Sequence, residues 1–455
     1  MKQIILTLAA VAVSVTAVSG QGTGMPMYYI DGLIYRRTSG TTVSCEGAFD
    51  DGVKNIVIPE TINANGSVFT VTGISDSAFA DYSYLYSVTI PGSVTTIGNS
   101  AFRGCSRLAS VTIPNSVTTI GGLAFYGCSG LASVTIGNGV TFIGNSAFYG
   151  CDNLASVTIP NSVTTIGHFA FSDCSGLASV TIGNSVTSIG SFAFYGCSGL
   201  ESVNISDLSA WCRIDFTDSE SNPLYHANNL YLDGELIRDL TIPDDITEIK
   251  YYAFCGCSRL ASVTIPDSVI SIWDSAFEDC SGLASVTIPN SVTTIGDSAF
   301  ENCWRIETLV IGRNVTSIGN CAFYVEYYNL KRIDVLASVP PSVASDDVFY
   351  SYRYSDTELN VPVGSLEAYR SADVWKKFKN IQEKDFGGVD GVEDDAVSVT
   401  AKGGSIEIAG ADNAPVEIYN LSGQLVHSGT ETTVGGLARG IYIVRVAGQT
   451  FKIAL

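Results

Sequence analysis

Apolar and polar positions recur along this chain with a period of 23 residues. The consensus of one copy is L-x-x-V-T-I-P-x-S-V-T-x-I-G-x-x-A-F-x-x-C-x-x, and the stretch LASVTIPNSVTTIG occurs three times without change. A fixed period of this length is typical of a solenoid, in which each copy buries its apolar face only by stacking on its neighbours. Copies begin at Leu85, Leu108, Leu131, Leu154, Leu177 and Leu200, resume at Ile237, Leu260, Leu283 and Ile306, and end with a degenerate copy from Leu330.

One copy predicts the course of one solenoid turn. Leu154, Val157 and Ile159 are apolar, and they alternate with Ser156 and Thr158, which predicts a strand with its apolar residues inward. The Pro-Asn pair that follows ends this strand. The letters V-T-T-I-G then predict a second buried ridge and a glycine corner, and G-x-x-A-F-x-x-C predicts a short helical turn whose Ala, Phe and Cys share one face.

One copy is expanded at residues 206–237. Within it, the letters NNLYLDGELI predict a hairpin that turns at Asp233-Gly234. We expect this insertion to interrupt the register of the repeats and to bulge from one face of the solenoid.

The composition favours an exported protein. Charged residues make up only 15% of the chain, its formal net charge is −21, and the acidic residues concentrate in 201–248 and 346–395. This charge argues against nucleic acid or an anionic membrane surface as partner. Lys2 followed by the apolar run Ile4–Val18 predicts a signal peptide over residues 1–20. No other apolar run is long enough to predict a transmembrane span.

The repeat resembles the BspA-like, or Treponema-type, leucine-rich repeat of secreted bacterial surface proteins. Order, spacing and residue type agree across the copies, and Val53–Phe79, widened by a hairpin at Asn65-Gly66, is similar to that family's first repeat. The segment Leu359–Ile381 is similar to its closing cap. The resemblance implies an α/β leucine-rich-repeat solenoid, right-handed and strand-rich, in a bacterial protein that is secreted or displayed at the cell surface and acts in adhesion.

In the last sixty or so residues, the 23-residue pattern gives way to one that predicts alternating strands and turns. The runs VEIYNLSGQLV (Val416–Val426) and GIYIVRV (Gly440–Val446) resemble a C-terminal sorting domain of type IX secretion, which implies a small all-β sandwich. The resulting domain plan is a signal peptide (1–20), a capping region with the first widened repeat (22–84), the solenoid (85–356), its C-terminal cap (357–382), a linker (383–395) and the sandwich (396–455).

The cysteines of the repeat predict a structural ladder. Equivalent positions point in parallel and rarely meet disulfide geometry, and no C-x-x-C pair or histidine partner suggests zinc. We therefore expect small buried residues that stack from copy to copy. The eight are Cys105, Cys128, Cys151, Cys174, Cys197, Cys257, Cys280 and Cys303.

Other candidate chemistry is sparse, and we predict neither an enzyme nor a cofactor or metal. The histidines His168, His226 and His427 lie far apart in sequence, and no G-x-S-x-G elbow occurs. Three acids of the insertion form either a calcium site or a solvated loop, namely Asp215, Asp218 and Glu220. The tripeptide D-S-A, at Asp76, Asp274 and Asp297, indicates either helix N-capping or an O-glycan acceptor of the kind known in some gut anaerobes.

The outward Ser and Thr of the strand are the best candidates for contact with a ligand. They form two ladders, one rung about 4.8 Å from the next, on a long and nearly uncharged surface. They are also explained by the solubility and β-propensity of threonine. The residues are Ser110, Thr112, Ser133, Thr135, Ser156, Thr158, Ser179, Thr181, Ser262, Thr264, Ser285 and Thr287.

Four functions therefore stand open. The first is an adhesin-like monomer that binds an extracellular protein or glycan through many weak contacts. The second is a stiff stalk or spacer that presents another site. An enzyme of unknown type and a protein that binds a periodic surface such as ice are the remaining two.

Overall fold

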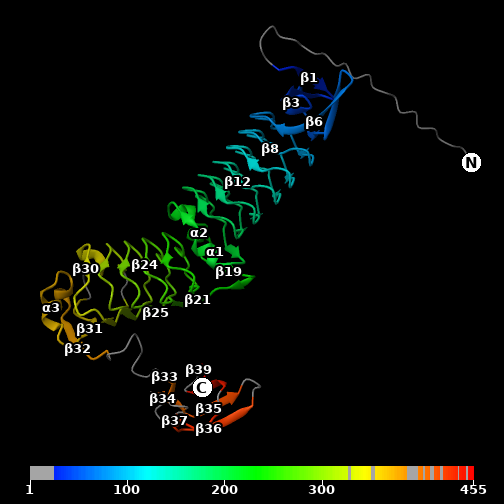
Figure 1. Cartoon of the computed structure of the whole chain (residues 1–455). Helices are drawn as coiled ribbons and strands as arrows, with labels where there is room; N and C mark the ends of the chain where they lie inside the picture. The colour runs from blue at the N-terminus through cyan, green and yellow to red at the C-terminus, as the bar shows by residue number, and fades with distance from the viewer. Residues whose placement is uncertain are drawn as a thin grey trace, which may run out of the picture.

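The computed structural model describes residues 25–325, 329–349, 354–386, 398–402, 405–409, 415–420, 424–438, 440–446 and 449–454. The predicted signal peptide and most of the predicted linker lie outside these residues. Figure 1 shows a long right-handed stack of rungs that ends at a capping helix, followed by a small β domain.

Each repeat forms one rung with a longer strand and a strand of two residues. The same residue types meet in register from rung to rung, as in Ile120 beside Ile143. The longer strands, which form what we call the strand face, are β7 (Ser87–Thr89), β9 (Ser110–Ile113), β11 (Ser133–Ile136), β13 (Ser156–Thr158), β15 (Ser179–Thr181) and β17 (Ser202–Ile205). The short strands are β8 (Thr96–Ile97), β10 (Thr119–Ile120), β12 (Phe142–Ile143), β14 (Thr165–Ile166) and β16 (Ser188–Ile189).

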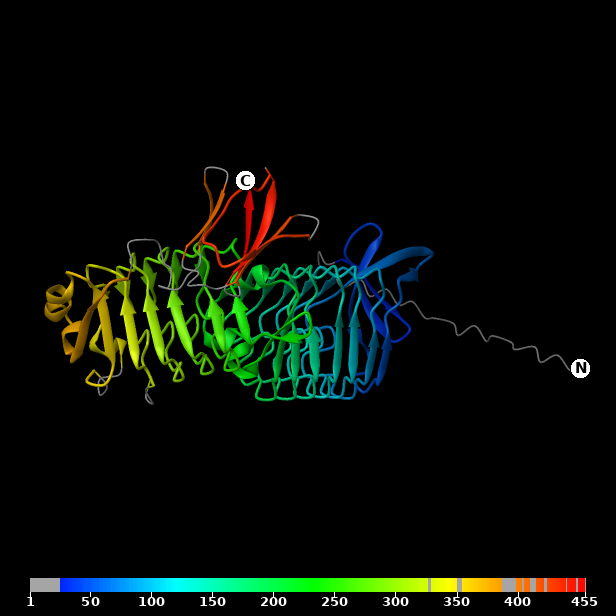
Figure 2. The same ribbon diagram turned by 90° about the horizontal axis from the view of Figure 1, so that it is seen from below.

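The pattern resumes after the insertion. Both sets of strands are again parallel, and Figure 2 shows the rungs side by side along the whole stack. The longer strands, which continue the strand face, are β21 (Asp239–Thr241), β23 (Ser262–Thr264), β25 (Ser285–Ile288), β27 (Thr308–Ile311) and β29 (Arg332–Val335). The short strands are β22 (Glu248–Ile249), β24 (Ser271–Ile272), β26 (Thr294–Ile295), β28 (Ser317–Ile318) and β30 (Ser342–Val343).

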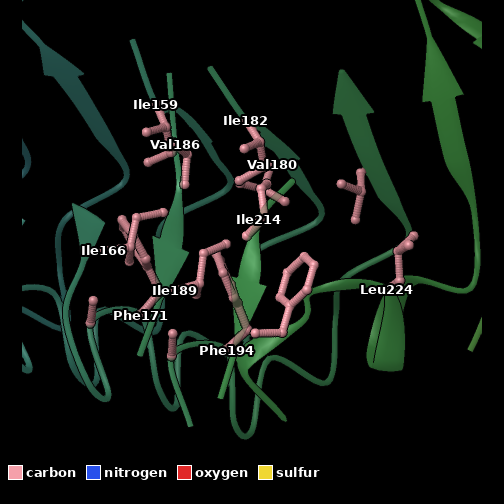
Figure 3. Close-up of a cluster of buried hydrophobic side chains, with 14 of the residues drawn as sticks. Ile159, Ile166, Phe171, Val180, Ile182, Val186, Ile189, Phe194, Ile214 and Leu224 are labelled. Atoms are coloured by element: carbon pink, nitrogen blue, oxygen red, sulfur yellow. The ribbon is translucent and has the colours of Figure 1, made fainter. Parts of the chain in front are cut away.

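The core is a set of ladders of identical residues. Leu154, Val157 and Ile159 are buried, which confirms the predicted alternation. The phenylalanine of A-F stacks on its equivalent in the next rung, with ring centroids 5.2 Å apart between Phe148 and Phe171. Figure 3 shows Phe171 beside Phe194 of the next rung. Because stacked copies bury the same surface again and again, each rung is stable only with its neighbours.

The segment G-x-x-A-F-x-x-C does not form the predicted helical turn. Its second variable residue adopts a left-handed conformation, as Ser100 does with φ 56°, which a right-handed helix does not allow. Backbone N–H groups alternate between acceptors within the rung and in the next rung. Ala101 donates to Gly98 at 3.4 Å, whereas Phe102 donates to Ala124 at 2.7 Å. Bonds between rungs thus replace the i→i−4 bonds of a helix.

The insertion is itself a rung, so the prediction that it bulges from one face was wrong. The predicted interruption of the register is confirmed, because both sheets end within the insertion and separate sheets begin at β21 and β22. It contains α1 (Leu208–Cys212), β18 (Asp215–Phe216), η1 (Ser219–Ser221), α2 (Leu224–Ala227), β19 (Leu230–Leu232) and β20 (Glu235–Leu236). Strand β18 pairs with β16 and β19 pairs with β17, so both sheets continue into the insertion. Trp211 is buried, and its indole Nε1 donates to the carbonyl of Ala253 at 2.9 Å. The predicted hairpin at Asp233-Gly234 joins β19 to β20 and is confirmed.

Both ends of the stack are covered. At the N-terminal end, β1 (Met27–Ile30), β2 (Leu33–Arg37) and β3 (Thr42–Ala48) precede β4 (Asn55–Val57), and the hairpin predicted at Asn65-Gly66 joins β5 (Thr61–Ala64) to β6 (Ser67–Ile74). The C-terminal end has η2 (Asp346–Val348), β31 (Glu358–Pro362), α3 (Leu366–Ser371), η3 (Trp375–Lys377) and β32 (Asn380–Lys384). The buried Tyr369 and Trp375 of this cap donate to the carbonyls of Ala337 and Pro341.

The C-terminal domain consists of two antiparallel sheets around one small core, in agreement with the predicted all-β fold. Ile406, Val416 and Val444 are among its buried residues. One sheet holds β33 (Ser398–Lys402), β34 (Ser405–Ala409) and β37 (Thr433–Val434), and the other holds β35 (Val416–Asn420), β36 (Leu425–Gly429), β38 (Ile441–Val446) and β39 (Gln449–Ala454). Across the described ranges, every helix is too short or too polar to cross a membrane.

Candidate functional site: a neutral groove on the strand face

The candidate Ser and Thr residues lie on the strand face, as the alternation predicts. Ten of the twelve are exposed, and Ser179 and Thr181 are half-buried. Thr112 lies beside Thr135, and Thr158 lies beside Thr181. The set is not one continuous ladder, because its strands belong to four separate sheets.

The hydroxyl groups of this set are available for a ligand. Among the described residues, Ser262 is the one member with a hydrogen-bond partner, the carboxylate of Asp239 at 2.5 Å. The threonines that directly precede the short strands differ, because their hydroxyls donate to the preceding rung. Thr141 donates to the carbonyl of Thr118 and Thr164 to that of Thr141, both at 3.2 Å. The two rows of one rung therefore have different roles.

The strand face is interrupted between β11 and β13. Strands β9 and β11 pair in one sheet and β13 and β15 in another, whereas the short strands β12 and β14 of the same rungs remain paired. A ladder of asparagine side chains is interrupted at the same junction. Asn115 accepts from the backbone N–H of Asn138, and Asn161 accepts from that of Asn184. In the described part of the chain, the Asn138 side chain has no hydrogen-bond partner.

A groove of about 420 Å³ lies at this interruption. Three aligned threonines, Thr135, Thr158 and Thr181, are the members of the predicted set that it brings together. The other nine predicted residues lie outside it. Its remaining lining residues are Val134, Ile136, Asn138, Ile159, Pro160, Asn161, Ile182, Gly183 and Ser206.

The groove is neutral and offers hydrogen bonds above an apolar floor. None of its lining residues is ionisable, and Ile136, Ile159 and Ile182 are buried beneath the threonines. The hydroxyls donate and accept, and the Asn138 amide adds two donors and an acceptor. Such a surface suits an uncharged, hydroxyl- or amide-rich ligand and disfavours ions, since it provides no counter-charge.

Sequence reasoning missed Asn138 and Asn161 as lining residues. The available signal was the turn Gly137-Asn138-Gly139, which replaces the P-x-S of the consensus in this rung. A Cβ atom at Gly139 would collide with the carbonyl oxygen of Asn115, so this turn packs more closely on the preceding rung than a serine would allow.

The cysteine ladder is a row of buried free thiols. All twelve cysteines are unpaired, and eleven of them are buried. The prediction of a purely apolar role was incomplete, because the thiols also donate hydrogen bonds. Cys105 donates to the carbonyl of Phe79 in the rung before, at 3.2 Å. Burial raises the pKa of Cys105 and of Cys257 to about 12, which keeps these thiols protonated and unreactive.

The three histidines lie in separate surroundings. His168 accepts from the backbone N–H of Ser191 through Nδ1, and His226 contacts Glu220 at 2.9 Å. His427 lies in the C-terminal domain. Nothing within the described ranges brings three His, Cys, Asp or Glu residues together with a metal-binding geometry.

The acids of the insertion point to different partners. Asp215 pairs with Lys250 at 2.5 Å, Asp218 accepts from the backbone N–H of Phe192, and Glu220 contacts His226. Each carboxylate thus serves a local contact.

The D-S-A aspartates do not cap helices. Asp76 accepts from the backbone N–H of Asn99 in the next rung at 2.6 Å, and Asp297 accepts from Asn320 in the same way. These side chains connect rungs. Of the serines that follow, Ser77 is exposed and Ser275 is buried, so glycan attachment, which stays a prediction, is sterically open at Ser77.

Comparisons with known proteins agree with this fold. The model of the BspA type leucine-rich repeat region matches residues 46–154, 72–201 and 227–353, more than half of the chain. Solved structures similar to the chain include a leucine-rich repeat protein from Bacteroides ovatus (26% identity, 78% of this chain and 99% of that chain, TM-score 0.46). A leucine-rich cell surface protein from Faecalibacterium prausnitzii gives 26% identity, 78% and 94% coverage and a TM-score of 0.42. The pneumococcal vaccine antigen PcpA gives 19% identity, 79% and 98% coverage and a TM-score of 0.42.

No curated protein matches the chain. The family model describes the repeat, and the residues that it matches include every groove residue except Ser206. The chain belongs to the BspA-type leucine-rich-repeat family.

Proposed function

We propose that this protein is an exported, adhesin-like binding protein that contacts an uncharged part of an extracellular glycoprotein or polysaccharide through its strand face. The observation that carries the proposal is the groove between β11 and β13. There, three threonine hydroxyls and the Asn138 amide face solvent without partners among the described residues. Family membership and the surface proteins among its structural relatives fit a repeat protein of the cell surface.

The distribution of charge supports an uncharged ligand. Between Arg107 and Arg213 the chain contains neither lysine nor arginine, and this stretch includes every groove residue. A sulfated or phosphorylated ligand would lack a counter-charge there. Contacts to hydroxyls and amides are individually weak, so a repetitive ligand that engages several rungs gains affinity through avidity.

The test compares two triple variants on an array of glycans and matrix proteins. We expect Thr135→Val/Thr158→Val/Thr181→Val to weaken binding at least tenfold, on the order of 1.4 kcal/mol, since it removes three hydroxyls and retains shape. Thr118→Val/Thr141→Val/Thr164→Val is the matched control, because its hydroxyls already donate to neighbouring rungs. Equal binding by both variants would reject the groove. Deletion of the insertion is unsuitable, because that segment is a rung of the core.

A spacer is the second candidate. The short-strand sheet runs unbroken from β8 to β18, and the phenylalanine stack runs from Phe79 to Phe194, which gives a stiff rod. If the wild-type protein bound nothing on the array, the spacer would replace the adhesin as the preferred function.

We also propose that the C-terminal domain directs export. Its two antiparallel sheets fit the sorting domain that its sequence resembles. Removal of residues 398–455 should leave the solenoid folded and retain the protein inside the cell envelope, measured by fractionation. Surface display of the truncated protein would contradict this role.

A further inference from the structure

A second surface feature lies on the turn segment G-x-x-A-F-x-x-C, away from the strand face. In four consecutive rungs, the residue before A-F and the residue after it give eight places, of which six carry large side chains and two carry Ser146 and Ser172. We call this set the aromatic ledge, and it consists of Leu123, Tyr126, Tyr149, Phe169, Phe192 and Tyr195.

The rings of the ledge are exposed and stacked. Phe169, Phe192 and Tyr195 are 39%, 40% and 48% exposed. Phe169 and Phe192 stack at 5.2 Å, and Tyr126 and Tyr149 stack at 4.8 Å. Tyr195 contacts Phe192 edge to face at 6.1 Å. Because the rings of each stacked pair cover part of each other's faces, the ledge presents ring edges and the outer faces of the pairs to solvent.

The backbone at the first ledge position is unfavourable for an aromatic residue. Phe169 and Phe192 have φ values of 55° and 58°, a conformation that bulky side chains rarely adopt. The fold requires this conformation in every rung but does not require a large side chain. Equivalent positions with φ between 54° and 56° carry Ser100, Ser146, Ser275 and Ser298.

The second ledge position shows the same contrast. Rungs outside the ledge carry Arg103, Glu278 and Glu301 there, and these rungs stack in the same way. Aromatic residues occur at these two positions outside the ledge as well, as Tyr252 and Tyr324, but both are half-buried. The exposed aromatic residues at these positions lie within four adjacent rungs, and this concentration favours a role other than folding.

The polar groups of the ledge are acceptors and hydroxyls. The neighbouring Asp173 carboxylate raises the pKa of Tyr149 to about 12, which keeps its hydroxyl protonated. Ser172 occupies the ledge position between Tyr149 and Tyr195. It is fully buried, and its hydroxyl has no partner among the described residues.

We propose that the aromatic ledge binds a neutral polysaccharide by packing its sugar rings against the exposed edges and outer faces of the aromatic rings. The negatively polarised face of an aromatic ring attracts the C–H groups on the flat side of a pyranose. Asp173 and the tyrosine hydroxyls accept and donate hydrogen bonds at its rim. An anionic glycan is disfavoured, because this part of the chain has a carboxylate and no lysine or arginine.

The dimensions of the ledge favour a glycan over a protein. It is two side chains wide and spans three intervals of about 5 Å between rungs. This strip is much smaller than the ~800 Å² that each partner contributes to a typical stable protein interface. An extended polysaccharide is narrow and repeats on the scale of one sugar ring, which matches a narrow surface that repeats on the scale of one rung.

The test is affinity electrophoresis of the full mature chain in gels that contain mixed-linkage β-glucan, glucomannan, galactomannan, soluble starch or heparin. We expect at least one neutral polysaccharide to retard the protein and heparin not to do so. Phe169→Ser/Phe192→Ser should weaken that binding roughly tenfold or more, because it removes two stacking contacts. Serine is the residue of the equivalent rungs, so the thermal midpoint of this variant should be unchanged or higher.

Two controls separate the ledge from other surfaces. Tyr86→Ser removes a 60% exposed aromatic residue outside the ledge and should bind as wild type. A ligand whose capture on the array is lost in the groove variant Thr135→Val/Thr158→Val/Thr181→Val but kept in the double serine variant belongs to the groove, so failure of one site is distinguishable from failure of the other. The proposal is overturned if no neutral polysaccharide retards the protein, if the double serine variant binds normally, or if the ledge residues affect capture of a protein only.

Discussion

Threonine occupies two rows of the same rungs, and the two rows differ in what their hydroxyls do. On the strand face, Thr158 and its equivalents expose hydroxyls without partners among the described residues. Six residues later, Thr164 donates to the carbonyl of the preceding rung. The backbone places a carbonyl within reach of one row and not of the other. Residue type and spacing are identical, so only the position of the neighbouring rung separates a structural hydroxyl from an available one.

The cysteine row extends this comparison into the core. Its thiols also donate to the preceding rung, as Cys174 does to Phe148 at 3.2 Å, but they are buried. Three rows thus differ in two properties, burial and bonding. The two rows whose side chains donate hydrogen bonds between rungs should contribute to stability. The strand-face threonine row, whose hydroxyls have no partner among the described residues, should contribute to recognition.

The largest effect that we expect comes from the buried thiols at alkaline pH. Folding raises the pKa of Cys105 and Cys257 from 9.0 to about 12. The stabilisation by a protonated thiol is complete below pH 9 and is lost as the pH rises toward 12, because only the unfolded thiol ionises in that window. Each such thiol should reduce the free energy of unfolding by about 1.4 kcal/mol per pH unit above its unfolded pKa. Urea denaturation at pH 8, 9 and 10 measures this slope.

A double variant provides the control for the alkaline effect. Cys105→Ala/Cys257→Ala should be less stable than wild type at pH 7. Between pH 9 and 10, however, its free energy of unfolding should fall less than that of wild type, because the contribution of two ionising thiols is absent. The same slope in both proteins would show that the thiols are not the cause of the alkaline loss.

The second effect concerns the two threonine rows directly. Thr118→Val/Thr141→Val/Thr164→Val should lower the free energy of unfolding by about 1–3 kcal/mol, because three hydrogen bonds between rungs are lost. The strand-face triple variant should change it by less than about 1 kcal/mol, since valine is an equally good strand residue. Urea denaturation monitored by circular dichroism measures both. An equal loss in the two variants would remove the distinction between the rows.

The sequence predicts the parts of this fold that depend on local alternation. The strands, the buried Leu154, Val157 and Ile159, the two hairpins and the cysteine ladder follow from spacing alone. The turn segment was mistaken for a helix because its hydrogen bonds run to the next rung, which local propensity does not report. The insertion was mistaken for a bulge because its apolar residues are irregularly spaced, although Trp211 reaches across to Ala253.

The position of the groove does not follow from the repeat consensus, because the two strands at the interruption have the same sequence. Both rungs at the interruption contain the letters S-V-T-I, yet β11 and β13 are not paired. The departure lies in Gly137-Asn138-Gly139, which changes the turn and not the strand. A repeat consensus therefore locates the face, whereas the deviation from the consensus locates the site.

The smallest effect that we expect distinguishes two asparagines of the equivalent turn. Asn161 accepts from the backbone N–H of Asn184 at 2.9 Å, whereas the Asn138 side chain has no partner in the described part of the chain. Asn161→Ala should lower the free energy of unfolding by about 0.5–1.5 kcal/mol. Asn138→Ala should leave stability within about 0.5 kcal/mol of wild type and weaken groove binding severalfold. The array and urea denaturation measure both properties. If Asn138→Ala were the less stable of the two variants, the Asn138 side chain would hydrogen-bond to the next rung. The asparagine ladder would then continue across the junction between β11 and β13, which would contradict the interruption on which the groove depends.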